Sequence, residues 1–178
     1  MEKWLESSTM FQGRIFSVRA GNAELDSGVV APREVVEHPG GVGLVPVLGD
    51  AVVLIRQYRI AVGEDVIEIP AGKLEPGDAP EQRARAELEE ETGYRAGRMV
   101  LAGHIYASVG YTSEKIHLFL AFDLEAIGQA LEFDETIETV RVPLAEIEGR
   151  LEANEFPDAK TVVALHRLLT YLEMRRHL

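Results

Sequence analysis

Residues 72–94 read GKLEPGDAPEQRARAELEEETGY, a glycine-containing loop followed by a glutamate-rich run. In this run Glu87, Glu90 and Glu91 stand at positions i, i+3 and i+4, which share one face of an α-helix. Carboxylates so close together repel one another, and the basic partner one turn before Glu87 is Arg83. The cluster is therefore either a solvated acidic stripe or a site for a hard cation such as magnesium, which binds several oxygen ligands.

The glutamate run has start and stop signals for a helix at about residues 80–92. Asp78 is a candidate N-cap, Pro80 suits the first turn, and Gly93 suits the residue after the last turn. A second helix is predicted at about 143–152. A third is predicted at about 158–176, where leucine and valine recur at helical spacing.

Strands are predicted where apolar or β-branched runs are bounded by Gly, Pro or Asp. Gly49-Asp50 resembles a hairpin turn between two of them. The predicted strands lie at about 13–20, 28–38, 43–48, 51–57, 66–69, 98–106, 115–123 and 137–142. We therefore expect an α+β chain with a mixed sheet flanked by helices, in a single domain over 1–178 whose residues 1–40 form an N-terminal strand region.

The composition is that of an ordinary folded protein, with 46% hydrophobic and 27% charged residues among 178. Thirty acidic against eighteen basic residues give a formal charge of -12, which argues against a nucleic-acid partner and makes an anionic substrate dependent on bound cations. The chain has no cysteine, so a metal must be held by oxygen or imidazole. The N-terminus has no signal-like apolar run and no membrane span is evident, so we expect a cytoplasmic protein without a membrane partner.

Residues 72–94 resemble the Nudix box, G(x5)E(x7)REUxEExGU, in which U is a bulky hydrophobic residue. The matching residues are Gly72, Glu87, Leu88, Glu90, Glu91 and Gly93, with Tyr94 at the last U. Two positions depart from the box. Asp78 stands in place of a glutamate, and Ala86 stands in place of the arginine that orients the metal-binding carboxylates. One hypothesis is that Arg83 compensates for the missing arginine.

The resemblance extends over nearly the whole chain and is closest to the ADP-ribose pyrophosphatase branch of the Nudix enzymes. It implies a Nudix-type α/β/α sandwich with an N-terminal antiparallel strand region. The segments that carry it, in the expected order, are PREVVEHPGGVGLVPV (32–47), LIRQYRIAVG (54–63), IEIPAGKLEPGD (67–78), ASVGYTSEKIHLFLA (107–121), FDETIETVRVPLAEI (133–147) and FPDAKTVVAL (156–165).

The same resemblance assigns roles to individual residues. It places metal ligands at the Ala71 carbonyl, Glu87 and Glu91, with Glu90 beside the same ions as a further ligand and catalytic residue. Substrate contacts are implied at Arg33, Glu34, Arg59 and Glu68. A proline that this branch often has past the box is absent, and Val109 and Tyr111 occupy that loop. Tyr111 either stacks on the substrate or packs against the protein.

The general base of this branch is a glutamate on a mobile loop outside the box. Here the acidic stretch Asp134, Glu135 and Glu138 corresponds to it, and Glu135 is the predicted base, with Asp134 and Glu138 as alternatives. A charged turn without a catalytic role would look the same in the sequence.

The resemblance implies hydrolysis of ADP-ribose to AMP and ribose 5-phosphate with Mg²⁺, for which Mn²⁺ is a possible substitute. Alternatives are a hydrolase of another nucleoside diphosphate derivative, such as a nucleotide sugar or a dinucleotide, and a Nudix module that senses ADP-ribose without cleaving it. Members of this branch are commonly homodimers joined through N-terminal strands. Trp4 and Phe11 are candidates for such packing, although a monomer core would use them equally well.

Overall fold

The computed structural model describes residues 1–131, 133 and 135–176. Its contacts divide the chain into two compact units, Met1–Gly40 with Tyr106–Lys115, and Gly41–Ile105 with Ile116–Leu178. The first unit contains the strand region expected at residues 1–40. Within the described residues, no helix is long and apolar enough to cross a membrane.

The first unit contains an antiparallel sheet in the order β1-β2-β3, formed by β1 (Lys3–Gln12), β2 (Ser17–Glu24) and β3 (Val30–Glu37). This confirms the predicted N-terminal antiparallel region. The strand predicted at 13–20 is wrong in its position. The Gly13 backbone N–H donates to the Phe16 carbonyl at 3.0 Å, so this segment turns and the strands lie on either side of it.

The second unit contains a mixed sheet in the order β10-β5-β4-β9-β8, in which β4 is parallel to β9 and antiparallel to β5. Two short strands extend it, since β6 pairs with β5 and β7 pairs with β4. Gly49, with φ of +62°, forms the predicted hairpin turn between β4 and β5. The strands are β4 (Gly41–Leu48), β5 (Ala51–Arg59), β6 (Glu64–Glu68), β7 (Ala71–Lys73), β8 (Tyr94–Tyr106), β9 (Lys115–Ala126) and β10 (Glu138–Pro143).

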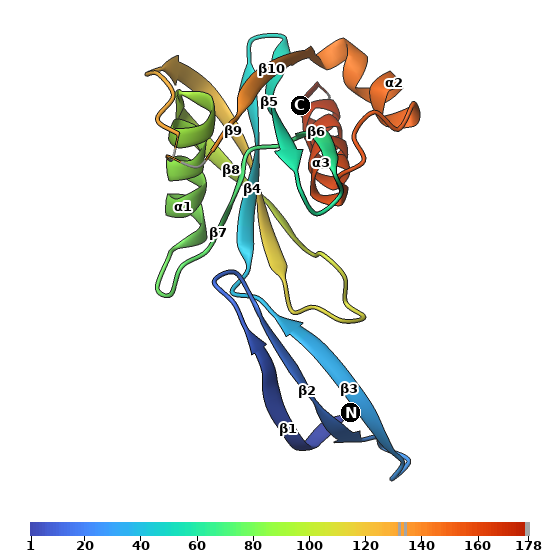
Figure 1. Ribbon diagram of the computed structural model, residues 1–178. Coiled ribbons are helices and arrows are strands. Elements are labelled where there is room, and N and C mark those ends of the chain that lie inside the picture. The colour runs from blue at the N-terminus through green and yellow to red at the C-terminus, as the bar shows by residue number, and fades with distance from the viewer. Residues whose placement is uncertain (132, 134, 177–178) are drawn as a thin grey trace. The chain divides into compact units, whose positions relative to one another are not determined.

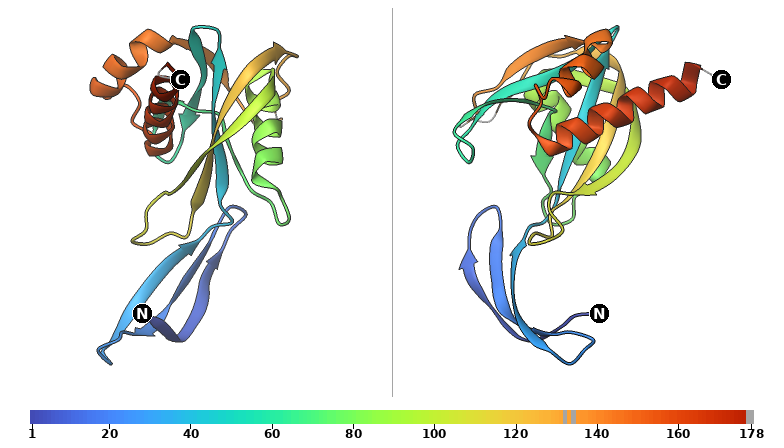
Figure 2. Two further views of the ribbon diagram at one scale, coloured as in Figure 1. Left: turned by 180° about the vertical axis from the view of Figure 1, so that it is seen from behind. Right: turned by 90° about the vertical axis from the view of Figure 1, so that its right-hand side faces the viewer.

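Helices cover both faces of this sheet (Figures 1 and 2). The helix α1 (Pro80–Glu87) lies on one face, and α2 (Ile147–Glu152) and α3 (Ala159–Arg176) lie on the other. Neighbouring residues of β9 therefore belong to opposite cores: Leu118 lies in the core with Leu165, and Phe119 lies in the core with Leu88. An unbroken apolar run is what a strand buried on both faces requires. The predicted α/β/α sandwich with a mixed sheet is confirmed.

The helix predicted at 80–92 is present, and it has two parts. Its first part is α1, and it continues as a π-helical segment, η1 (Leu88–Thr92), which ends at Gly93 with φ of +73°. The predicted N-cap is wrong. Ala79 occupies that position without a side-chain bond, and Asp78 instead accepts a hydrogen bond at 2.8 Å from the Glu75 backbone N–H, which closes the preceding loop. The other predicted helices correspond to η2 (Leu144–Glu146) followed by α2, and to α3.

Candidate active site

The three box glutamates lie where the α-helix widens into the π-helical segment. π-Helical turns inside longer helices are uncommon and occur frequently at functional sites. Glu87 is the last residue of α1, and Glu90 and Glu91 belong to η1. Glu87 and Glu91 are only 4% and 3% exposed, whereas Glu90 is partly exposed. The three carboxylates are therefore not a solvated stripe, because two of them point into the protein.

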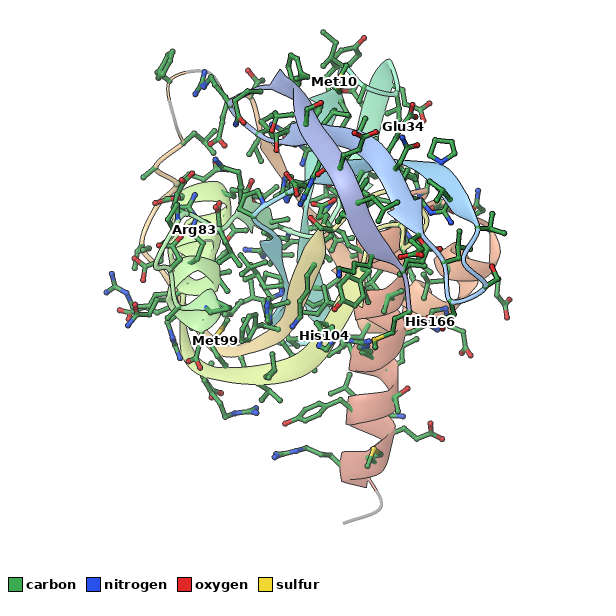
Figure 3. All side chains as sticks on the ribbon, turned by 90° about the horizontal axis from the view of Figure 1, so that it is seen from below. Met10, Glu34, Arg83, Met99, His104 and His166 are labelled. Atoms are coloured by element: carbon green, nitrogen blue, oxygen red, sulfur yellow. The ribbon has the colours of Figure 1, made fainter. Side chains whose placement is uncertain are left out.

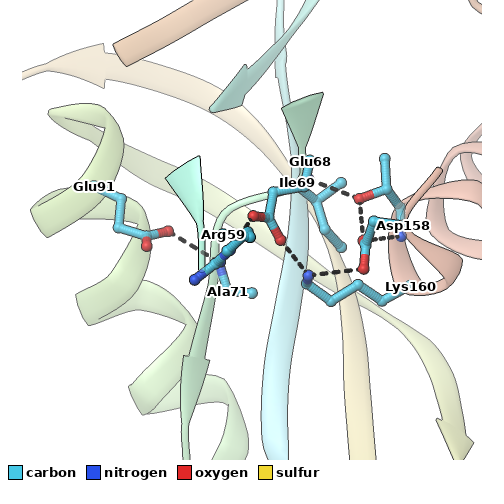
Figure 4. Close-up of polar contacts among 8 residues, drawn as sticks. Arg59, Glu68, Ile69, Ala71, Glu91, Asp158 and Lys160 are labelled. Atoms are coloured by element: carbon cyan, nitrogen blue, oxygen red, sulfur yellow. Dashed lines mark hydrogen bonds and ion pairs between the residues drawn. The ribbon is translucent and has the colours of Figure 1, made fainter. Parts of the chain in front are cut away.

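Glu91 is held against the backbone of β7. Its Oε2 accepts a hydrogen bond from the Ala71 backbone N–H at 2.9 Å (Figure 4). This contact brings the carboxylate to the residue whose carbonyl is the predicted metal ligand. A single backbone donor stabilises a buried carboxylate only in part, since several are needed to offset full burial.

Glu87 is packed onto Gly72, the first residue of the box. A Cβ atom on Gly72 would lie 1.4 Å from Glu87 Oε1, so only glycine leaves room for this carboxylate. Arg83, which projects from α1 (Figure 3), lies 2.5 Å from the same oxygen through its Nη2. Arg83 therefore occupies one side of the Glu87 carboxylate and the Gly72 backbone occupies another.

Burial gives both glutamates unusual proton affinities. It raises the pKa of Glu87 to about 7, with Arg83 opposing the rise and Glu90 and Glu135 adding to it. Burial also raises the pKa of Glu91 to about 8, with Glu87 and Glu135 adding to the rise and the Ala71 N–H opposing it. Burial is thus the main reason that both carboxyl groups keep their protons to higher pH, and the neighbouring carboxylates add to this effect.

The donor set fits a hard divalent cation. Mg²⁺ prefers carboxylate and carbonyl oxygens and usually keeps several water ligands. Glu87, Glu91 and the backbone at Ala71 come together here, and Glu90 is close enough to raise the pKa of Glu87. Among the residues that the structure describes, no three Asp, Glu or His side chains are arranged to hold a metal ion by themselves. Backbone carbonyl, water or substrate oxygens would have to complete the ligand shell.

The raised pKa values predict how pH affects the stability of the metal-free protein. The folded state holds protons on Glu87 and Glu91 up to about pH 7 and 8, whereas the unfolded state releases them near the ordinary value of 4.5. The folded state therefore binds more protons between these values, and the free energy of unfolding falls as pH rises. In EDTA we expect Tm to be several degrees lower at pH 8.5 than at pH 6 by differential scanning fluorimetry.

A matched pair of variants separates this effect from general pH sensitivity. Glu91→Gln should remove a large part of the fall in Tm, because it removes one of the two titrating groups. Glu81→Gln should leave the fall unchanged, because Glu81 is exposed and paired with Arg85 at 2.9 Å. A Tm in EDTA that stays level or rises between pH 6 and 8.5 would contradict the prediction.

The loop that follows β9 attaches to the end of the glutamate helix. The backbone N–H groups of Ile127 and Ala130 donate to the carbonyls of Gly93 and Glu90 at 2.8 and 3.1 Å. The side-chain amide of Gln129 donates to the Glu91 carbonyl at 2.5 Å. Gln129 was not among the predicted site residues. These bonds satisfy carbonyls that a helix end leaves unpaired, and they connect this loop to the candidate metal ligands.

Glu135 lies farther along this loop and is close enough to Glu87 and Glu91 to raise the pKa of both. The alternative base Glu138 is the first residue of β10 and is exposed, with Oε2 3.1 Å from Nη1 of Arg56. The other alternative, Asp134, lies outside the described residues. The assignment of the base to Glu135 stays a prediction.

Arg59 and Glu68 form a charged cluster with residues that the sequence analysis gave no role (Figure 4). Arg59 Nε donates to Glu68 Oε1 at 2.5 Å, and Lys160 contacts the other oxygen of Glu68. Arg59, Glu68 and Asp158 also line a cavity of about 370 Å³. Lys160 and Asp158 lie in the segment 156–165, but Glu68, the partner of Lys160, is 92 residues away from it in the sequence.

The remaining predicted substrate residues belong to the first unit. Arg33 lies on β3 and forms two hydrogen bonds of 2.7 Å with the Glu2 carboxylate. Glu34 is exposed on the same strand. Tyr111 is 59% exposed, and its carbonyl accepts a hydrogen bond from the Val36 N–H at 2.7 Å. Their substrate roles stay predictions.

Comparison with known proteins adds an independent line of support. Residues 37–165 match the NUDIX domain family. The chain is 35% identical to an ADP-ribose pyrophosphatase from Bacillus subtilis (strain 168), covering 99% of this chain and 95% of that protein. It is also 35% identical to a methanol dehydrogenase activator from Bacillus methanolicus, covering 94% and 92%. A crystal structure of an ADP compounds hydrolase superposes with a TM-score of 0.86 at 28% identity, covering 99% of this chain and 97% of that one.

Proposed function

Because this chain belongs to the NUDIX family, we propose that it is a divalent-metal-dependent pyrophosphohydrolase that cleaves ADP-ribose to AMP and ribose 5-phosphate. The observation that carries the proposal is the buried pair Glu87 and Glu91, whose carboxylates lie against the backbone of Gly72 and Ala71. The substrate is taken from two of the similar proteins, which are named for ADP-ribose and for ADP compounds.

In the proposed site, Glu87, Glu90, Glu91 and the Ala71 carbonyl hold the metal ions, Mg²⁺ or Mn²⁺. When bound, the ions supply positive charge that neutralises the diphosphate and its transition state. Glu135 accepts the proton of the attacking water, and Arg59 binds a phosphate through its guanidinium. Arg33, Glu34, Glu68 and Tyr111 are the proposed further contributors to substrate binding.

Measurement of phosphate release tests this proposal. The diphosphate of ADP-ribose resists a phosphatase, whereas both proposed products are phosphate monoesters that the phosphatase cleaves. We expect phosphate release from ADP-ribose only when the chain, a divalent cation and the phosphatase are all present. Faster phosphate release from a nucleotide sugar or a dinucleotide would show that this compound, and not ADP-ribose, is the preferred substrate. Calorimetric binding of ADP-ribose without any release would instead identify a sensor.

Arg83 takes a position suited to replace the missing box arginine. Burial lowers the pKa of its guanidinium, but the carboxylates of Glu87, Glu90 and Asp78 together raise it above the ordinary value. Arg83 is within electrostatic reach of Asp78, which is one of the two departures from the box. It also stands one turn before Glu87, the residue that follows the other departure, Ala86. We propose that this guanidinium orients the metal-binding carboxylates from a position three residues earlier in the helix.

The variant Arg83→Ala tests this replacement. We expect kcat to fall by about tenfold or more and the metal concentration for half-maximal activity to rise, because Glu87 loses a charge-assisted partner. Arg85→Ala is the matched control on the same helix, since Arg85 pairs with Glu81 and the Ala96 carbonyl. Unchanged turnover and unchanged metal dependence in Arg83→Ala would exclude the compensation.

We further propose that the protein forms a homodimer through the first unit. Several apolar side chains there are exposed, including Leu5 at 53%, Met10 at 68% and Phe11 at 52%. Trp4 is partly exposed and lies beneath the Arg19 guanidinium, 4.9 Å from it. Light scattering of the full chain and of a chain lacking residues 1–20 should give a dimer and a monomer, respectively.

We also propose a cytoplasmic location for this protein.

A further inference from the structure

The start of α3 is fixed to the residue that follows β6 by hydrogen bonds of the Asp158 and Thr161 side chains. Asp158 Oδ2 accepts hydrogen bonds from the Thr161 N–H at 2.9 Å and from the Thr161 hydroxyl at 2.6 Å, which caps the helix. The same hydroxyl oxygen accepts a bond from the Ile69 N–H at 2.9 Å, and Thr161 is fully buried. The first turn of α3 is therefore attached directly to the residue that follows Glu68.

This attachment places Lys160 beside Glu68. The Lys160 side chain is 14% exposed, and its Nζ contacts Glu68 Oε2 and lies 3.1 Å from Asp158 Oδ1. A partly buried ammonium group is costly unless it is paired, and here two carboxylates pair with it. Lys160 is thus held in one position by groups on β6 and at the start of α3.

Glu68 connects Lys160 to Arg59. The Glu68 side chain is 2% exposed, and its two oxygens have different partners, Arg59 Nε on Oε1 and Lys160 on Oε2. A carboxylate with only the Arg59 partner would be free to rotate about its last bond. With both oxygens occupied, its plane is fixed, and so is the direction from which Arg59 Nε donates.

Arg59 is left with its terminal nitrogens available. Its Nε is used by Glu68, its side chain is 39% exposed, and no hydrogen bond from Nη1 or Nη2 is found among the described residues. The guanidinium partly opposes the rise in the pKa of Glu91, so it lies near the candidate metal ligands. A planar guanidinium with one edge fixed presents the other edge in a defined direction, which suits two oxygens of one phosphate.

We propose that Lys160 is a positioning residue that acts through Glu68 to orient Arg59 toward a substrate phosphate. The inference rests on the proposed function for its substrate. Its geometric basis is the pair of contacts that joins Lys160 to Glu68 and Glu68 to Arg59, which we call the relay. A merely structural Lys160 would affect Tm without affecting substrate binding.

The test uses the full chain with ADP-ribose and Mg²⁺. Lys160→Met keeps the length of the side chain and removes the charge, and we expect it to raise KM by about tenfold or more with a smaller change in kcat. Lys160→Arg, which keeps the charge, should recover most of the loss. Arg175→Met, at the other end of α3, is the matched control and should leave KM unchanged. Lys160→Met combined with Arg59→Met should be no worse than Arg59→Met alone, because both changes disable one relay.

A second measurement does not depend on the substrate. The Nε–H resonance of Arg59, identified by its loss in Arg59→Lys, should move or broaden in Lys160→Met and keep its position in Arg175→Met. An unchanged resonance, or fully additive effects of the two substitutions on KM, would overturn the relay. Failure of the wild-type protein to hydrolyse ADP-ribose would overturn the proposed substrate, and the resonance would still decide the role of Lys160.

Discussion

Replacing Glu91 by glutamine is expected to lower kcat for ADP-ribose by about 10²–10³-fold, the loss that follows removal of one electrostatic stabiliser from a preorganised site. Glutamine keeps an oxygen that can accept the Ala71 N–H bond now made by Glu91 Oε2. It removes the negative charge that a divalent cation would need. Steady-state kinetics at several Mg²⁺ concentrations will measure the loss, and Glu90→Gln should also reduce turnover severely.

Stability should change in the opposite direction to activity. The metal-free protein carries a carboxyl at position 91 whose pKa is raised to about 8 by burial and by Glu87. At pH 8.5 that group is largely ionised in an unfavourable environment, so Glu91→Gln should raise Tm in EDTA while it lowers activity. A gain in stability together with a loss of function is typical of residues retained for catalysis.

The matched control is Glu89→Gln in the same π-helical segment. Glu89 pairs with Arg95 at 2.7 Å and is outside the predicted ligand set. The kcat of Glu89→Gln should therefore remain within about threefold of wild type, because only a surface ion pair is lost. Activity within about tenfold of wild type in both Glu90→Gln and Glu91→Gln would show that the metal assignment is wrong, since each removes a proposed ligand charge.

The parts of the fold that the sequence predicted well depend on local signals. Pro80 and Gly93 mark the two ends of one helix, and both lie where expected because a missing N–H and a positive φ are properties of single residues. The apolar run in β9 also predicted a buried strand. By contrast, β1 was missed because its polar and apolar residues do not alternate and none of them is buried.

Some of the parts that were not predicted depend on contacts distant in the sequence. Lys160 and Glu68 are brought together by the packing of α3 against the sheet, and no local pattern at either position indicates the pairing. The π-helical turn was also not predicted, since an ideal helix was the natural expectation for residues 88–92. Asp78 looked like a helix cap because its residue type suits a cap, but its side chain closes the preceding loop instead.

Gly72→Ala is expected to lower kcat/KM by about 10²-fold, because the new methyl group would occupy the place of the Glu87 carboxylate. The added Cβ would lie 1.4 Å from Oε1, 2.0 Å from Cδ and 2.6 Å from Cγ of Glu87. These three nearest atoms all belong to the Glu87 side chain, so we expect the fold to survive while Glu87 is displaced from the site. Circular dichroism and steady-state kinetics will separate the two effects.

Gly149→Ala is the matched control for an added methyl group. Gly149 lies in α2 with no atom within 4 Å of the added Cβ, so alanine should leave kinetics unchanged and raise stability by about 0.5–1 kcal/mol through helix propensity. The double variant of Gly72→Ala with Glu87→Gln should be no worse than Glu87→Gln alone, because both changes remove one carboxylate from one place. Additive losses would instead mean that Gly72 acts by a route other than Glu87, and the packing of this glutamate on the first glycine of the box would lose its proposed role in metal binding.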